Sequence, residues 1–209
     1  MSQLILYHSP YSPFSRSVLL LCHHLKLDVK VMELNLAEGE HLQSDFTRIN
    51  PQRCVPTLDD NGFILWESRA ILSYLAAIRG QHLVPQTTQE EAKLNQRLFS
   101  EMGGIALKYA EIYVTRKIQR NLFQAFFVSL YFNYFQRPLF NNSTELDQDK
   151  IKELYEMFSL INENYFSDEN KWIAGEKLTV ADFAFASTVA GLIVSFRCQE
   201  FQTQSEVNS

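Results

Sequence analysis

Serine and proline residues recur in the stretch HSPYSPFSRSVLLLC, residues 8 to 22, which runs into an apolar segment. Ser12 directly precedes Pro13, the arrangement of a helix N-cap followed by proline at the first helical position. A helix start also carries unpaired N–H groups and a partial positive charge, which favour an anion. Arg16, one turn further on, would strengthen that field. Ser12 is therefore a structural cap or a hydroxyl that holds an anion, and one hydroxyl can do both.

Two other short stretches could add polar groups to the same region. In CVPT, Pro56 is either an ordinary edge-strand proline or a cis-proline that turns the Val55 backbone toward a peptide-like ligand. In WESR, Glu67 and Ser68 begin a new helical pattern. They either cap that helix or bind the ammonium and carboxylate groups of a small zwitterion.

The histidines and cysteines form no familiar metal or redox motif. His23 and His24 are adjacent on a helical pattern and point about 100° apart, so they cannot share one metal ion. The three cysteines, Cys22, Cys54 and Cys198, form no C-x-x-C pair. Neither a glycine-rich phosphate loop nor a G-x-S-x-G elbow is present. We therefore expect no metal site and no cofactor.

Composition restricts the partners and the location of the chain. Its formal net charge of -5 argues against nucleic acid as a partner, because phosphate binding needs a basic surface. The uncharged segment 121–136 is too short and too polar to cross a bilayer, and the N-terminus lacks the features of a signal peptide. We expect a cytoplasmic protein with reduced thiols and no membrane contact.

The apolar patterns that would position these side chains change character near residue 80. Before it, strand and helix signals alternate, which predicts a compact α/β unit over residues 1–80. The expected elements are strands at 4–9 and 27–34, helices from 13, at 40–50 and at 67–80, and a hairpin within 54–68 that turns at Asn61-Gly62.

Residues 81–88 are polar and are expected to form a linker. Beyond it every strong signal is helical, which predicts an all-α domain over residues 89–209 that ends in a polar tail. Within it, Thr179 and Asp182 have the form of a capping box, with aspartate in place of the usual glutamate. The predicted class is α/β followed by all-α.

These residues, in this order, resemble the cytosolic glutathione S-transferases, most closely the insect delta and epsilon classes. The matching segments are SPFSRSVLL, GEHLQSDFTRINPQRCVPTLDDNGFILWESRAILSYL, NQRLFSEMG and AGEKLTVADFA. The resemblance implies a thioredoxin-like N-terminal domain, a helical C-terminal domain and a homodimer. It also implies an enzyme of detoxification that transfers glutathione, a co-substrate, to small hydrophobic electrophiles.

The resemblance also implies roles for individual residues. Ser12 matches the serine that hydrogen-bonds the glutathione sulfur, and Val55 matches the residue before a cis-proline whose backbone pairs with the tripeptide. Tyr11 is the fallback hydroxyl donor, because other transferase classes use a tyrosine nearby. The residues expected to bind glutathione are His41, Arg53, Cys54, Val55, Pro56, Glu67, Ser68 and Arg69.

Two features depart from the family pattern. Arg53 stands where delta-class enzymes usually have histidine, although arginine can still meet a carboxylate, and bidentately. The family also continues into further C-terminal helices that wall the electrophile pocket, so the helical domain is expected to be shortened here. Tyr11, Tyr109 and Tyr113 are the wall candidates, and ordinary core aromatics are the alternative for the last two.

Two other functions stay open at this point. The chain could bind glutathione or hydrophobic ligands without catalysis. It could also be a thiol-transferase, which needs a cysteine at the first helix start. The nearest cysteine, Cys22, falls more than two turns into that helix on its apolar face, so this third hypothesis ranks lowest.

Overall fold

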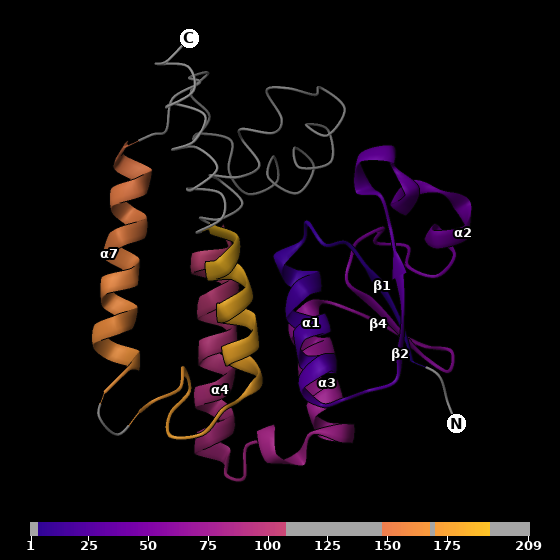
Figure 1. The fold of residues 1–209 in the computed structure, drawn as a ribbon. Coiled ribbons are helices and arrows are strands. Elements are labelled where there is room, and N and C mark those ends of the chain that lie inside the picture. Colours follow the sequence, from indigo (N-terminus) through magenta and orange to yellow (C-terminus); the bar gives the residue numbers. More distant parts are fainter. Residues whose placement is uncertain (1–3, 108–147, 168–169, 193–209) are drawn as a thin grey trace.

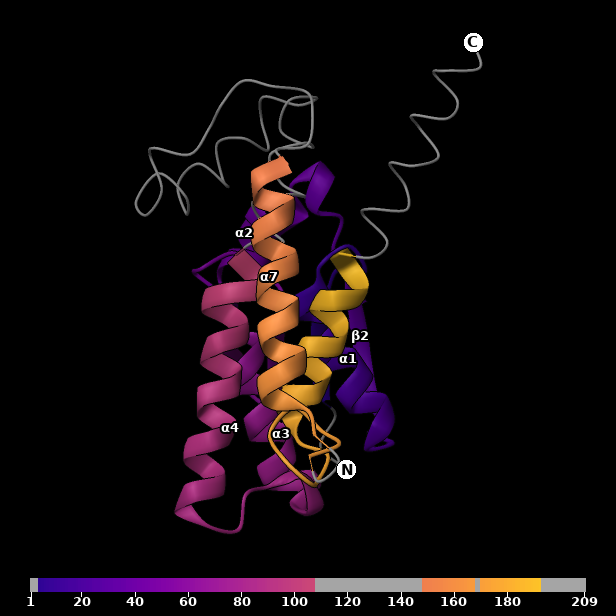
Figure 2. The ribbon, with the colours of Figure 1, turned by 90° about the vertical axis from the view of Figure 1, so that its left-hand side faces the viewer.

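A four-stranded sheet with layers of helices packed beside it makes up most of the part of the chain that the structure describes. The computed structural model describes residues 4–107, 148–167 and 170–192. In Figure 1 the sheet is followed by α1 and α3, then by α4 with the helix at 180–192, and then by α7. Figure 2, turned by 90°, shows α4, α7 and the helix at 180–192 side by side in front of α1 and α3.

The sheet is mixed, with the strand order β2-β1-β3-β4. β1 pairs in parallel with β2, while β3 pairs antiparallel with both β1 and β4. Asn61 and Gly62 join β3 to β4 with φ values of 55° and 89°, the left-handed conformation that a tight hairpin turn requires. The strands are β1 (Leu4–His8), β2 (Val29–Glu33), β3 (Thr57–Asp60) and β4 (Phe63–Trp66).

The helices of the first half follow the expected order. One expected helix is different: residues 40–50 contain a 3-10 turn and a four-residue α2, because Gln43 between them is extended at ψ 152°. The helical elements are α1 (Pro13–His24), α2 (Ser44–Thr47), α3 (Ser68–Arg79), and the 3-10 turns η1 (Leu36–Glu38) and η2 (Glu40–Leu42).

The described part of the second half is mostly helical, apart from non-helical residues 166–167 and 170–179, where Trp172 and Gly175 form an isolated β-bridge. A 3-10 turn, η3 (Gln81–Leu83), lies in the expected linker, and a capping box between Thr87 and Glu90 begins α4 (Thr88–Ser100). A π-helical segment, η4 (Glu101–Ile105), continues α4 directly. α7 spans Gln148–Tyr165, and a last helix runs over residues 180–192.

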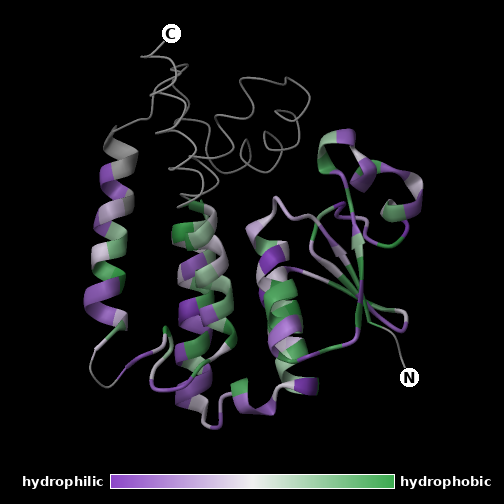
Figure 3. Cartoon of the chain, viewed as in Figure 1, coloured by the Kyte–Doolittle hydropathy of each residue, from purple (hydrophilic) through white to green (hydrophobic). Residues whose placement is uncertain are grey.

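The core lies where α1 and α3 are sandwiched between the sheet and the helical half. Leu21, Ile71 and Leu75 are completely buried there, and burying each such side chain is worth about 1.5–3 kcal/mol. Figure 3 shows the apolar residues running along α1 and α3 in this layer. The packing fixes the direction of both helices and therefore where each one begins.

The Thr179–Asp182 pair caps the helix at 180–192, as expected. The Asp182 carboxylate accepts hydrogen bonds from the backbone N–H groups of Thr179 (2.8 Å) and Ile173 (2.9 Å). Together with the sheet and the helical second half, this confirms the predicted class of α/β followed by all-α. No helix in the described ranges has the length and apolar character to span a bilayer, and segment 121–136 lies outside those ranges.

Candidate active site at one edge of the sheet

The three stretches singled out in the sequence meet at one edge of the sheet. Tyr7, the second-last residue of β1, pairs with Thr57 at the start of β3, and Thr57 pairs with Trp66 at the end of β4. The chain therefore leaves β1 toward Ser12, enters β3 from Pro56 and leaves β4 toward Glu67 at neighbouring positions. The expectation that these elements share an edge is confirmed.

Ser12 is the N-cap of α1. Its Oγ accepts a hydrogen bond from the backbone N–H of Ser15 at 3.2 Å, and Pro13 occupies the first helical position. The hydroxyl proton is not used by that bond, since a hydroxyl accepts and donates independently. Ser12 is half-buried, so its hydroxyl can cap the helix and still donate to an anion at the helix start.

The loop before Ser12 is held by Arg16. The Arg16 Nη1 donates to the carbonyl oxygen of Pro10 at 2.8 Å, and the Ser12 N–H donates to the Ser9 carbonyl at 3.1 Å. Arg16 thus acts on the shape of the loop as well as on the local charge. Tyr11, at the outer side of this loop, has 68% of its surface exposed.

The loop before β3 is organised around a buried amide. The Asn50 Nδ2 donates to Thr57 Oγ1 at 2.8 Å and to the Cys54 carbonyl at 3.2 Å, and the Asn50 Oδ1 accepts from the Gln52 N–H at 2.8 Å. The Val55–Pro56 peptide bond that follows is cis. The predicted cis-proline is therefore confirmed, and the hydrogen bonds of Asn50 hold the loop that contains it.

Two predicted binding residues, Arg53 and Cys54, belong to the same loop. Arg53 is exposed and has a φ of 56°. Burial raises the pKa of the Cys54 thiol, with a smaller opposing effect from the Asn50 amide and a further rise from the Glu67 charge. The thiol is therefore neutral near pH 7, and Cys54 can contribute contacts but no charge.

Glu67 does not cap α3. No side-chain capping bond is present at this position, and its φ of 69° with ψ of 104° is unusual for a residue with a Cβ. Such a conformation costs on the order of 1–3 kcal/mol and marks a functional site more often than an arbitrary loop. Glu67 is exposed, whereas Ser68 beside it is buried as the first residue of α3.

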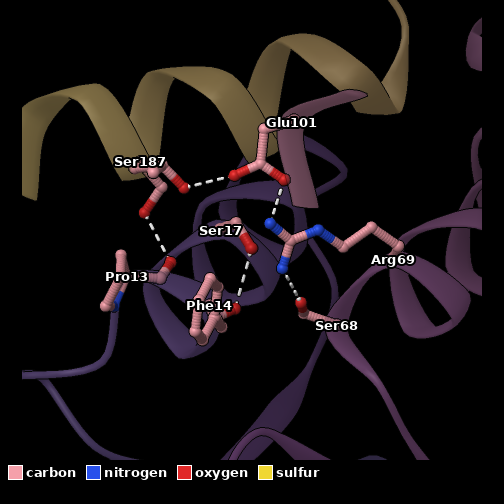
Figure 4. A network of polar contacts seen from close by, with 8 residues as sticks. Pro13, Phe14, Ser17, Ser68, Arg69, Glu101 and Ser187 are labelled. Atoms are coloured by element: carbon pink, nitrogen blue, oxygen red, sulfur yellow. Dashed lines mark hydrogen bonds and ion pairs between the residues drawn. The ribbon is translucent and has the colours of Figure 1, made fainter. Parts of the chain in front are cut away.

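A polar network ties both helix starts to the helical half (Figure 4). The Arg69 guanidinium donates through Nη1 to Ser68 Oγ at 2.7 Å and through Nη2 to the Glu101 carboxylate. The other Glu101 oxygen accepts from Thr188 Oγ1 at 2.6 Å. The guanidinium also lies over the Phe14 ring, 4.8 Å from its centroid, so α3 and α1 are braced against each other.

The same part of the helical half also holds α1 directly. Ser187 Oγ donates to the carbonyl oxygen of Pro13 at 2.7 Å (Figure 4). Pro13 is the residue after Ser12, so this contact helps to set the position of the cap. The helix at 180–192 therefore helps to position the start of α1 without forming part of the candidate site itself.

Several of these supporting residues were missed in the sequence. Glu101 had a detectable signal, because it falls at core spacing with Leu94, Leu98 and Ile105, a position where an unpaired carboxylate would be costly. Its partners Arg69 and Thr188 lie 32 and 87 residues away. Pairing over such distances has no local sequence signal.

Among the remaining predicted residues, His41 lies in η2 and is half-buried, and burial lowers the pKa of its imidazole. Its contact with a ligand stays a prediction. Tyr109, Tyr113 and Cys198 lie outside the described residues. Cys22 is buried, and desolvation raises the pKa of its thiol to about 12. A thiol in that state lacks the reactivity that a thiol-transferase needs.

Comparison with known families matches both halves of the chain. The glutathione S-transferase N-terminal domain matches residues 2–77, and the glutathione S-transferase C-terminal domain matches residues 120–196. Glutathione S-transferase D7 of Anopheles gambiae is 36% identical over 191 residues, which are 89% of this chain and 75% of that protein. The D7 protein of Drosophila melanogaster is 34% identical over 193 residues, 91% of this chain and 75% of the relative.

Solved structures give the same grouping. A delta-class glutathione transferase from Nilaparvata lugens has a TM-score of 0.70 and 34% identity, over 89% of this chain and 76% of that one. An epsilon-class enzyme from the housefly Musca domestica has a TM-score of 0.67 and 30% identity, over 89% and 76% of the two chains. These comparisons confirm the resemblance to the insect delta and epsilon classes.

Proposed function

The chain belongs to the glutathione S-transferase family, and we propose that it joins the thiol of reduced glutathione to small hydrophobic electrophiles, with Ser12 stabilising the thiolate. The observation that carries this proposal is the placement of Ser12. It caps α1 with a hydroxyl whose proton is still available, at the sheet edge where the cis Val55–Pro56 bond and the start of α3 also lie.

The chemistry requires the thiolate, because a free thiol with a pKa of about 8.5 is mostly protonated at neutral pH. Each pKa unit of depression needs about 1.4 kcal/mol of preferential thiolate binding. A charge-assisted hydrogen bond from Ser12 and the positive end of α1 are together of that size. The thiolate sulfur then bonds to the electrophilic carbon, and the leaving group departs with its electron pair.

The loop 50–57 and the start of α3 would hold the rest of the tripeptide. The Val55 backbone pairs with the cysteinyl part, while Glu67 and Ser68 hold the ammonium and carboxylate of the γ-glutamyl end. The Ser68 hydroxyl is oriented for this by the Arg69 guanidinium. His41 and Arg53 bind the glycyl carboxylate, and Cys54 lines the same loop.

On the electrophile side, we propose Tyr11 as one wall, since it is largely exposed next to Ser12. Tyr109 and Tyr113 are proposed as further wall residues on the resemblance alone.

We also propose, from the family and the composition, a division into residues 1–80, 81–88 and 89–209, a homodimer, a role in detoxification and a cytoplasmic location. The reaction as proposed needs no cofactor besides the co-substrate glutathione.

The test is to measure glutathione binding and conjugation of a chloronitrobenzene for Ser12→Ala and Ser15→Ala. Ser15 is the matched control, because its hydroxyl is buried in the same helical turn and makes no hydrogen bond to any described residue. Ser12→Ala should lower kcat by about 10- to 100-fold, the value of one charge-assisted hydrogen bond, and shift the pH profile upward. Ser15→Ala should keep most of the activity.

Each other outcome has a definite meaning. Full activity in Ser12→Ala would remove Ser12 from the mechanism, and loss of activity in Tyr11→Phe would transfer its role to Tyr11. Glutathione binding without conjugation of any electrophile by the wild-type protein would favour the non-catalytic alternative.

A further inference from the structure

Two imidazoles meet at a corner of the molecule that the proposed chemistry does not use. His24 is the last residue of α1, and His82 lies in η3. Their Nε2 atoms are 3.4 Å apart, both side chains are exposed, and 58 residues of chain separate them. No motif search of the sequence would pair them.

We propose that His24 and His82 form a binding site for a borderline divalent cation such as Zn²⁺. Two nitrogens that each lie 2.0–2.1 Å from a tetrahedral zinc ion are about 3.4 Å apart, which is the separation observed here. The cation would replace the direct contact between the two Nε2 atoms. Each neutral imidazole would then carry its proton on Nδ1, and a rotation of the exposed His82 ring would turn its lone pair toward an ion held beside His24.

The backbone around the pair favours a positive charge. α1 ends at His24, with Leu25 as its C-cap, and α3 ends at Arg79, with Gly80 as its C-cap. The two ends touch, because a Cβ on Gly80 would lie only 2.9 Å from a Leu25 methyl carbon. Figure 1 shows both helices ending at the same end of the molecule. Each helix C-terminus has a partial negative charge, so two such ends support one cation.

The His24 ring is also held in place. Phe183, from the helix at 180–192, packs against it edge to face with ring centroids 5.2 Å apart. A ligand that is already oriented loses less conformational freedom when the metal binds. The site therefore joins α1, η3 and the helical half in one contact.

The ligand set determines which cations fit. The charged side chains nearest in sequence to the pair, Lys26 and Arg79, are both basic. Within the described ranges no group of three or more His, Cys, Asp or Glu residues could hold a metal, so water fills the other positions. Imidazole nitrogen without carboxylate selects Zn²⁺, Ni²⁺ or Cu²⁺ over Mg²⁺ and Ca²⁺.

The proposed cation site lies far from Ser12, because α1 is 12 residues long, about 18 Å, and separates the two. A bound cation would therefore act on the stability of the fold and not on the reaction.

The test is a zinc titration of untagged full-length protein, with the free ion followed by a chromophoric chelator, alongside thermal unfolding with and without Zn²⁺. We expect Zn²⁺ to bind and to raise Tm, because a ligand of the folded state stabilises it. His24→Gln and His82→Gln should each weaken the binding by at least about tenfold, since even partners outside the coordination shell are worth about 10- to 100-fold. His23→Gln, an exposed neighbour on the same helix, is the matched control and should bind Zn²⁺ like the wild type.

Three results would overturn the proposal. One is a wild-type protein whose Tm does not respond to Zn²⁺. Another is unchanged affinity in either His24→Gln or His82→Gln, and the third is an equal loss in His23→Gln. Circular dichroism of each variant without metal checks that the fold is intact, so that a loss of binding reports the missing ligand.

Discussion

Arg69 and Glu101 form an ion pair that joins the sheet-containing half of the chain to the helical half. The Glu101 side chain is fully buried and that of Arg69 is 14% exposed. Both oxygens of the carboxylate are used, one by Arg69 and the other by Thr188. The pair therefore combines a structural contact with the orientation of Ser68, the residue proposed to hold one end of glutathione.

We predict that Glu101→Gln destabilises the protein by about 3 kcal/mol, because the largely buried Arg69 loses the counter-charge that Glu101 supplies while the shape of the Glu101 side chain is kept. Urea unfolding measures this difference. Glu156→Gln is the matched control, since Glu156 pairs with Lys152 at 3.9 Å on the surface. Exposed pairs contribute about 0–1 kcal/mol. Equal effects of the two variants would contradict the assigned role of Glu101.

Asn50→Ala should destabilise the protein by about 2–3 kcal/mol, because the change removes a buried amide that bonds to Thr57 and to the Cys54 carbonyl. The loop that contains Val55 and Pro56 also loses the hydrogen bonds that hold its shape, so KM for glutathione should rise more than kcat falls. Steady-state kinetics and urea unfolding measure the two effects. Gln52→Ala is the control, because Gln52 bonds to Asn50 through its backbone N–H and not through its side chain. A comparable rise in KM for Gln52→Ala would contradict the assigned role of Asn50.

Cys22 should resist alkylation in the folded protein. With a pKa of about 12, only about one molecule in 10,000 carries the Cys22 thiolate at pH 8, and the thiolate is the species that reacts. Treatment with iodoacetamide followed by peptide mass spectrometry should find Cys22 unmodified until urea unfolds the protein. The half-buried Cys54 is the internal comparison. Rapid native labelling of Cys22 would reopen the thiol-transferase hypothesis.

Stability should fall as the pH drops below about 6.5, with His8 as one source. Burial lowers the pKa of His8 and the Arg16 charge lowers it slightly more, against opposing effects of the Glu33 charge and of a backbone hydrogen bond at Ser15. The unfolded chain takes up a proton near pH 6.5 while the folded protein keeps His8 neutral, so the unfolded state binds more protons in that window. Unfolding free energies between pH 5.5 and 7.5 measure the slope. His8→Gln should flatten it, and an unchanged slope would assign the effect to other groups.

Features encoded by neighbouring residues were predictable. The Asn61-Gly62 turn, the Ser12-Pro13 helix start and the Thr179–Asp182 cap each depend on chemistry within four residues. The common edge of the three site stretches also followed, because the order of strands and helices restricts how a small sheet can be built.

Features that depend on distant residues were not predictable in the same way. Arg69 appeared only as part of the WESR stretch, although its partner Glu101 lies 32 residues further on. His24 was compared with its neighbour His23, whereas its actual contact is His82, 58 residues away. Among these residues, only Glu101 had a sequence signal of a buried partner, because its carboxylate falls on the apolar face of its helix. The short helix expected within 40–50 is present as α2 (Ser44–Thr47), and it begins only after Gln43 because the backbone of Gln43 is extended.

The contact between Ser187 and Pro13 joins residues 174 positions apart. During synthesis the sheet and α1 can leave the ribosome long before residue 187 exists. The start of α1 cannot form its hydrogen bond with Ser187 until residue 187 has been made, and contacts of large sequence separation form late. Ser12, the residue proposed to hold the thiolate, would therefore reach its final position late in folding, so that chains ending before residue 187 would carry the fold of the first half without a finished site.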